Sequence, residues 1–402
     1  MRPPLVPPYS KGGDSTPLST TTFPLRIRGN QKGVLSFGLL AFWLFSFCLP
    51  GFAFHESGVA NCAACHVMHN SENGTWIDPT APGGRPMLLK FATATDACLS
   101  CHATDLGSVW GSDPLHPPAE KGAGNFSYLS SVNLADGPNS AMHPISGSHA
   151  GHNVIAESRG SMYDPTYPTA PGGTYPSSAM SCTSCHDPHG NKNFRMLYGQ
   201  GHVAAGDFIF VNPAPRAQGI SITSGKETST SHTAYVSGMS AWCANCHGTY
   251  HQNGVGTFQH PADQPMGRDI ALSYNQYAGS DNPTGGDMAT SYLPSVPFED
   301  PSATTAGTTG PSLASRISCV SCHRAHGTSG PNAGRWDFNV VLLRQDGVLS
   351  GSFPIPIPYA SANQKSLCCK CHANGETHGG NQSCISCHMN NSGVNRALPR
   401  LK

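Results

Sequence analysis

The chain has 402 residues, of which only 11% are charged, with 23 basic and 23 acidic side chains in balance. This charge excludes proteins that hold nucleic acid on a strongly basic surface. With 45 glycines, 34 prolines and 38% hydrophobic residues, the composition also argues against a large apolar core made of polypeptide alone.

Residues 1–53 differ from everything that follows them. Basic side chains precede an apolar run at 34–49, and the small residue Ala53 comes a few positions later. This layout predicts a secretory signal peptide with an unusually long n-region, cut near Ala53. A membrane anchor is the alternative, but it needs about 20 apolar residues, whereas Pro50 closes this run after 16. The long n-region also leaves open a true start codon further along the chain.

Removal of the leader changes the net charge of the protein. The leader carries five of the basic residues and one of the acidic ones, so residues 54–402 keep 18 basic against 22 acidic side chains. No basic patch remains that would suit a nucleic acid. The sequence therefore predicts an exported protein with no nucleic-acid partner.

Seven Cys-x-x-Cys-His pentapeptides follow the leader, and we number them one to seven in chain order. Their cysteines are Cys62 and Cys65, Cys98 and Cys101, Cys182 and Cys185, Cys243 and Cys246, Cys319 and Cys322, Cys368 and Cys371, and Cys384 and Cys387. Their histidines are His66, His102, His186, His247, His323, His372 and His388. This pattern is the attachment signature of c-type haem: the cysteines form thioethers to the porphyrin, and the histidine ligates the iron. The sequence therefore predicts seven covalently attached heme c groups.

Other uses of cysteine explain the pattern less well. Fourteen of the 16 cysteines lie in the motifs, which leaves only Cys48 and Cys369. Disulfide frameworks are common in secreted proteins, but they give no role to the histidine after every pair. Zinc ribbons use two pairs for each four-coordinate site, and seven pairs cannot be divided in that way. Cys369 is interpreted as a spare thiol, because only Cys368 has the correct spacing to Cys371.

The spacing between motifs predicts the fold class. Successive motifs begin 36, 84, 61, 76, 49 and 16 residues apart, which excludes a solenoid of fixed period. The long segments 213–231 and 282–315 show neither a helical nor a strand period. We predict one domain over residues 54–402, mostly irregular coil with short helices and few strands, in which the chain of haems is the core. The chain without haem is predicted not to fold.

Thirteen histidines remain after the seven motif histidines, enough for a second iron ligand at every haem. Seven are candidates for this distal position: His69, His189, His251, His326 and His378 follow a motif histidine by three to six residues, and His152 and His260 lie further away. His55 and His116 rank below them, and a solvated loop histidine is the alternative for each. A histidine three residues after a motif histidine cannot reach the opposite face of the same iron, so it must serve a neighbouring haem. Ligation by histidine throughout implies low reduction potentials, since an axial methionine raises them.

Segments between the motifs carry a family resemblance. They are Phe54-His55, Gly58-Val59-Ala60, Val67-Met68-His69-Asn70, Pro86-Met87-Leu88-Leu89, Gly151-His152-Asn153, Ala170-Pro171-Gly172-Gly173-Thr174-Tyr175-Pro176, Asp187-Pro188-His189-Gly190, Met239-Ser240-Ala241-Trp242, His260-Pro261-Ala262 and Arg324-Ala325-His326. From Phe54 to about His372 the chain resembles the hexahaem nanowire cytochromes, which polymerise into extracellular conducting filaments in metal-reducing bacteria.

The resemblance implies a mature protein that begins near Phe54 and conducts electrons through bis-histidine haems as a subunit of an extracellular filament. The implied partners are copies of the chain itself, upstream outer-membrane or periplasmic cytochromes, and extracellular acceptors such as metal oxides or other cells. In the family, the histidine equivalent to His69 ligates the fifth haem of the next subunit, here the haem of His323. Residues 373–402 depart from the six-haem pattern and add the seventh motif, with His378 as its expected distal ligand.

Two other functions are weighed against the filament. A monomeric electron shuttle, in the periplasm or at the cell surface, would use the same haems without polymerisation. A multihaem reductase would need a haem with an open distal position, often marked by lysine in place of the motif histidine. All seven motifs end in histidine, and Lys370 lies inside its motif. We therefore predict an electron-transfer protein without catalytic residues, located outside the cell or on its outer surface, with the periplasm as the alternative.

Overall fold

The computed structural model describes residues 62–103, 109–111, 122–129, 133–134, 143–144, 150–164, 166–220, 227–251, 262–338, 340–347 and 355–372. All of the described residues belong to one unit, Ala53–Lys402. The predicted signal peptide lies outside the described residues. So do the seventh motif and the candidate ligands His55, His116, His260 and His378.

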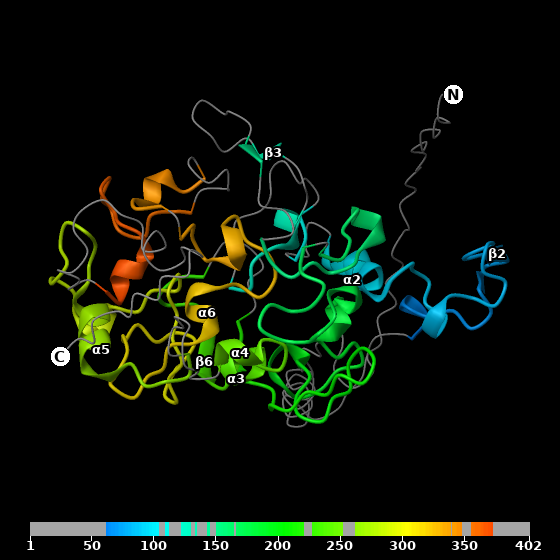
Figure 1. Ribbon diagram of the computed structural model, residues 1–402, viewed down its shortest axis with the longest axis horizontal. Helices are drawn as coiled ribbons and strands as arrows, with labels where there is room; N and C mark the ends of the chain where they lie inside the picture. Colours follow the sequence, from blue (N-terminus) through cyan, green and yellow to red (C-terminus); the bar gives the residue numbers. More distant parts are fainter. Residues whose placement is uncertain are drawn as a thin grey trace, which may run out of the picture. The chain divides into compact units, whose positions relative to one another are not determined.

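In the described parts of the chain, short helices and three antiparallel strand pairs are separated by coil (Figure 1). The α-helices are α2 (Ala94–His102), α3 (Met239–Cys243), α4 (Gly248–His251), α5 (Gly267–Gln276) and α6 (Cys319–Cys322). The antiparallel strand pairs are β1 (Ser71–Glu72) with β2 (Thr75–Trp76), β3 (Asn133–Leu134) with β4 (His143–Pro144), and β5 (Arg216–Gln218) with β6 (Ala234–Ser237). The predicted fold class, mostly coil with short helices and few strands, is confirmed.

Single 3₁₀ turns fill much of the space between these elements. They are η2 (Cys62–Ala64), η3 (Pro86–Leu88), η4 (Phe126–Leu129), η7 (Glu157–Arg159), η8 (Ser177–Ala179), η9 (Cys182–Ser184), η10 (Phe194–Met196), η11 (Met288–Thr290), η12 (Pro331–Ala333), η13 (Leu343–Gln345) and η14 (Leu367–Lys370). Among the described residues, none of the helices has the length and apolar composition that crossing a membrane requires.

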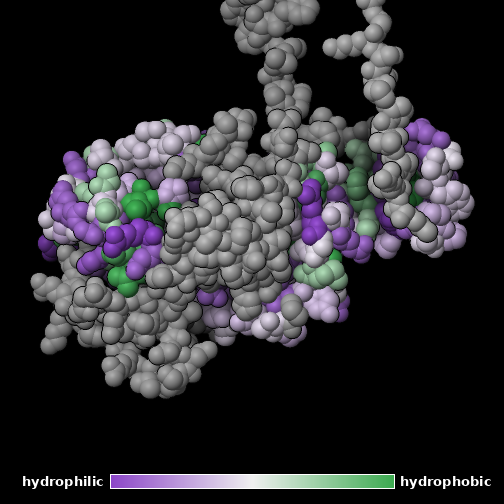
Figure 2. Space-filling view, turned by 90° about the horizontal axis from the view of Figure 1, so that it is seen from above, coloured by the Kyte–Doolittle hydropathy of each residue, from purple (hydrophilic) through white to green (hydrophobic). Residues whose placement is uncertain are grey.

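The apolar side chains are buried in three separate clusters. One surrounds Trp110 and Phe126, a second surrounds Tyr274 and Trp336, and a small third one surrounds Tyr235. Several motif cysteines pack at the edges of the second and third clusters, at the places where a porphyrin would attach. Other hydrophobic residues are exposed, and Figure 2 shows them as patches among hydrophilic side chains on one face of the molecule. The polypeptide alone therefore covers its apolar groups only in part.

Candidate functional site: a row of haem-attachment turns

Each described motif forms one helical turn. The backbone N–H of the motif histidine donates to the carbonyl of the first cysteine four residues earlier: His66 to Cys62 at 2.9 Å, His186 to Cys182 at 3.0 Å, His247 to Cys243 at 3.0 Å, His323 to Cys319 at 3.0 Å and His372 to Cys368 at 3.1 Å. In the second motif the turn is the last part of α2. Residues three and four apart share one face of a helix. The turn therefore places two thiols and one imidazole on the same side.

Serines inside the motifs stabilise two of these turns. The backbone N–H of Ser181 donates to Oγ of Ser184 at 2.9 Å, and that of Ser318 donates to Oγ of Ser321 at 3.1 Å. Each serine thereby satisfies an N–H group that the start of a helix leaves without an intrahelical acceptor. The residues between the two cysteines thus help to form the attachment turn.

The motifs follow one another in space in their sequence order. The thiols of Cys98 and Cys182 lie close enough to perturb each other's pKa, as do those of Cys243 and Cys319, which places motif two beside three and motif four beside five. Electrostatic interactions between cysteines join the remaining neighbours: Cys65 with Cys98 and Cys101, Cys185 with Cys246, and Cys322 with Cys368 and Cys371. Burial first, and then the neighbouring Cys246, raises the pKa of Cys185 to about 12. Six attachment sites therefore form one continuous row, an order that the sequence alone did not give.

Backbone carbonyls orient four of the motif histidines. Nδ1 of His66 lies 2.9 Å from the carbonyl oxygen of Met87, and Nδ1 of His186 lies 2.9 Å from that of Arg195. Nδ1 of His247 lies 2.7 Å from the carbonyl oxygen of Pro171, and Nδ1 of His323 lies 3.0 Å from that of Asn332. A carbonyl can only accept, so Nδ1 carries the proton and Nε2 keeps its lone pair. This contact fixes the tautomer of metal-binding histidines in many proteins.

Three of these carbonyls belong to residues with left-handed backbone conformation. Met87, Arg195 and Asn332 have φ values of 56°, 51° and 57°, and the residue after each is also left-handed. Residues other than glycine adopt this backbone conformation at a cost of about 1–2 kcal/mol each, and such strain is concentrated at functional sites. These carbonyls were not predictable from the sequence, because no residue type marks them.

Three histidine rings lie opposite motif histidines. The ring centroids are 6.4 Å apart for His66 and His189, 6.3 Å for His186 and His326, and 5.9 Å for His247 and His152. A bond of about 2 Å between a metal and each imidazole nitrogen, together with the size of the rings, requires a spacing of this order. The described motif cysteines are also free of disulfides. The donor set thus fits heme c held between two histidines.

Burial keeps two of the paired rings, His247 and His326, neutral. Burial is the main reason that the pKa of His326 is lowered to about 3 and that of His247 to about 4. The ring of His326 additionally stacks on Phe126 with 4.5 Å between centroids. Only neutral imidazole can donate its lone pair to iron. Both rings are therefore in the protonation state that ligation needs at neutral pH.

Three of the predicted distal ligands, His152, His251 and His69, differ in their surroundings. His152 is oriented by the carbonyl oxygen of Ala325, 2.5 Å from its Nδ1. Nε2 of His251 lies 3.7 Å from the carboxylate of Asp263, so its role as an iron ligand stays a prediction. His69 is exposed on the loop that follows the first motif.

Motifs one, three and five repeat one arrangement, which we call the relay unit. The three relay units span residues 62–89, 182–197 and 319–334, and each has a second histidine three residues after the motif histidine: His69, His189 and His326. Each also closes on itself through a β-bridge from the motif histidine to Leu89, Leu197 or Gly334. The second histidine of one unit lies opposite the motif histidine of the unit before it. Within the described part of the chain, no second histidine ring lies opposite His323 of the third unit.

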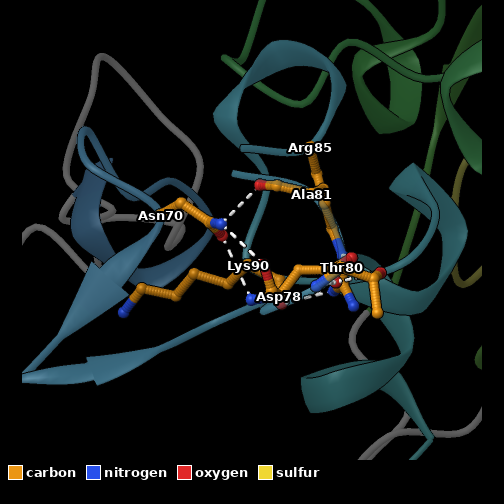
Figure 3. A network of polar contacts seen from close by, with 6 residues as sticks. All are labelled: Asn70, Asp78, Thr80, Ala81, Arg85 and Lys90. Atoms are coloured by element: carbon orange, nitrogen blue, oxygen red, sulfur yellow. Dashed lines mark hydrogen bonds and ion pairs between the residues drawn. The ribbon is translucent and has the colours of Figure 1, made fainter. Parts of the chain in front are cut away.

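A polar network stabilises the loop of the first relay unit (Figure 3). The buried amide of Asn70 donates to the carbonyls of Asp78 at 2.7 Å and Ala81 at 2.6 Å, and it accepts from the N–H of Asp78 at 3.1 Å. Arg85 Nε contacts the Asp78 carboxylate at 3.0 Å. Hydrogen bonds from Thr80 and then from Arg85 lower the pKa of Asp78. The network holds the residue next to His69, so His69 projects from an ordered loop.

We expect Asn70→Ala to loosen this loop and to destabilise it by roughly 2 kcal/mol, because three partly buried hydrogen bonds are lost. Hydrogen exchange of residues 70–90 in the haem-loaded protein should accelerate in this variant. Thr80→Ala is the matched control, since it removes only an exposed contact with Asp78 and should leave the exchange nearly unchanged. Equal protection in Asn70→Ala and the native protein would contradict the role assigned to Asn70.

A row of attachment turns, with carbonyl-oriented imidazoles and paired histidine rings in a coil-rich fold, defines a multihaem c-type cytochrome. A Doubled CXXCH motif matches residues 176–207. The C-type cytochrome OmcS of Geobacter sulfurreducens is 31% identical over 437 aligned positions, which cover 85% of this chain and 99% of that protein. The chain therefore belongs to the OmcS family of cytochromes.

Two solved structures from Geobacter sulfurreducens are similar to this chain. The Outer Membrane Cytochrome S Filament matches with a TM-score of 0.65 at 27% identity, and the structure of the OmcS nanowires matches with a TM-score of 0.65 at 28% identity. Each match covers 80% of this chain and 100% of the solved one. The family resemblance found in the sequence is thereby confirmed.

Proposed function

We propose that this cytochrome carries heme c at all seven motifs and conducts electrons as a subunit of an extracellular homopolymer. When bound, the haems supply one-electron redox chemistry. At the described motifs the chain offers a helical turn for attachment, orients four motif imidazoles through backbone carbonyls and places a second imidazole opposite three of them. Iron held by two histidines would leave no position for a substrate, so we propose electron transfer without enzymatic turnover.

The order of the relay units is the observation that best supports assembly into a polymer. His189 of the second unit lies opposite His66 of the first, and His326 of the third lies opposite His186 of the second. Continuation of the same rule beyond the third unit requires a histidine opposite His323. The first unit of another copy offers His69, which is exposed. The subunit junction would then repeat the contact that already joins units within one chain.

The relatives support this reading, because the two similar solved structures are a filament and nanowires. We propose the same assembly for this chain, outside the cell, with electrons supplied by upstream outer-membrane or periplasmic cytochromes. Metal oxides or other cells are the proposed acceptors. Electron microscopy of the purified, haem-loaded protein tests the assembly: filaments support the proposal, whereas isolated particles favour a monomeric periplasmic or surface shuttle.

We expect seven covalent haems, because every motif has the same spacing and a terminal histidine. Intact mass after extraction with acidified organic solvent should show seven haems retained. Spectra of the oxidised filaments should be low-spin throughout. A sizeable high-spin signal in filaments would instead favour a reductase with an open iron site.

A truncated variant tests whether the seventh haem site is independent of the other six. Ending the protein after Ala373 removes the seventh motif and His378, and this variant should retain six haems, all low-spin in filaments. If one of the six becomes high-spin, His378 serves another haem and its predicted role is wrong.

A further inference from the structure

Two cations near the fifth and sixth motifs are fully buried. Arg335 and Lys370 each expose 1% of their surface, which is rare for these residue types unless they are paired with a carboxylate. Among the described residues neither forms such an ion pair. A buried charge without a counterion costs several kcal/mol, so its retention calls for a role.

Lys370 lies inside the sixth motif, between the cysteines that would bind the porphyrin. Its Nζ donates to the carbonyl of Tyr277 at 2.9 Å and lies over the rings of Tyr274, 4.5 Å from the centroid, and Tyr359, at 5.5 Å. Aromatic faces attract a cation and not a neutral amine. The carbonyl and the two ring faces therefore stabilise the charge of Lys370 against burial, which lowers its pKa to about 8.

Arg335 is bound in the same way beside the fifth motif. Its Nε donates to the carbonyl of Val320 at 2.5 Å, and its backbone N–H donates to the carbonyl of Cys322 at 2.7 Å. The other guanidinium nitrogens donate to the carbonyls of Pro294 at 3.3 Å and Gly122 at 3.2 Å. These acceptors are all neutral, so the positive charge stays within the low-dielectric interior that surrounds the fifth motif.

The two cations lie in one apolar environment. Cys322 of the fifth motif and Cys368 and Cys371 of the sixth pack against the same buried cluster, around Tyr274 and Trp336. Water, which would screen the charges, is excluded there. Charge interactions in such a place are several times stronger than at the surface.

Resting on the proposed haem attachment, we propose that Arg335 and Lys370 raise the reduction potentials of the fifth and sixth haems relative to the rest of the row. Reduction adds one electron to iron, from Fe(III) to Fe(II), and the neighbouring haem in the row loses that electron. The reduced site carries one positive charge less, so a buried cation favours it. Electrons in a partly reduced chain therefore reside at this end.

A potentiometric titration of haem-loaded Lys370→Met, followed by visible absorbance, tests the proposal. The methionine fills similar space without charge, so the high-potential end of the titration curve should move to more negative values. Lys370→Arg keeps the charge and should restore the native curve. Lys365→Met is the matched control: it makes the same change five residues away at an exposed side chain, where water screens the charge, and its curve should equal the native one.

Intact mass and spin state, measured first on each variant, separate this proposal from the proposed haem attachment. A native haem count with an unchanged curve in Lys370→Met overturns the tuning role and leaves the proposed function standing. A native protein without haem at the sixth motif would overturn both. If Lys370→Met does not mature, Arg335→Met decides in the same assay, and an unchanged curve there overturns the proposal equally.

Discussion

The His69→Ala variant should keep all its covalent haems and form no filaments. The thioethers depend on the motif cysteines, which this change leaves intact, whereas the subunit junction would lose its coordinate bond. Metal ligation contributes directly to the free energy of an assembly, as it does to folding. Electron microscopy and intact mass on the same preparation measure both halves of this expectation. Normal filaments would show that the iron of His323 takes its second ligand from within its own chain.

Spectroscopy locates the defect in this variant. One haem of His69→Ala should be high-spin or water-ligated, and added imidazole should return it to low spin without restoring filaments. His202→Ala is a suitable control, because His202 stacks on Tyr198 with 3.4 Å between centroids and has no predicted iron. That variant should polymerise. Loss of filaments in both variants would point to general misfolding.

The chain made without haem should not fold cooperatively. Its apolar side chains form three small clusters with motif cysteines at their edges, and large groups such as Met68, 76% exposed, lie at the surface. Ordering each residue costs about 1–2 kcal/mol of backbone entropy, which such small clusters cannot offset in a chain of this length. Seven porphyrins would supply the missing apolar surface.

Residues 54–402 produced in the cytoplasm, without export or haem attachment, test this expectation. The near-ultraviolet circular dichroism should be featureless and the thermal scan should lack a transition, whereas the exported, haem-loaded protein should unfold cooperatively. A sharp transition in the haem-free chain would mean that the polypeptide supplies its own core, and the predicted fold class would need a different explanation.

Local chemistry made the attachment sites predictable. The spacing of two cysteines and a histidine is a covalent requirement, so it is visible as a pattern in the sequence. The coil-rich fold was predictable from the high glycine and proline content together with long segments that have no helical or strand period. The spatial order of the motifs was not predictable, since contacts such as Cys98 with Cys182 span 84 residues of aperiodic chain. The carbonyl of Asn332 was equally hidden, because a backbone atom in a strained turn can belong to any residue type.

Distal ligation was predictable only in part. The three-residue spacing showed that His189 and His326 must serve a neighbouring haem, but it did not tell which one. The structure places His189 opposite His66 and His326 opposite His186, so each reaches back to the preceding relay unit. This direction depends on the path that the loops between motifs take in space. Those loops have no hydrophobic period from which their structure could be predicted.

The relay unit has a consequence for modularity. Each unit offers a histidine backward and accepts one from the unit ahead, so both ends of a chain built from whole units are mutually compatible, whatever the number of units. Gain or loss of one unit by duplication or deletion would change the length of the monomer and leave its terminal chemistry unaltered. Chains of different length could then share one polymer, provided that each begins and ends on a complete unit.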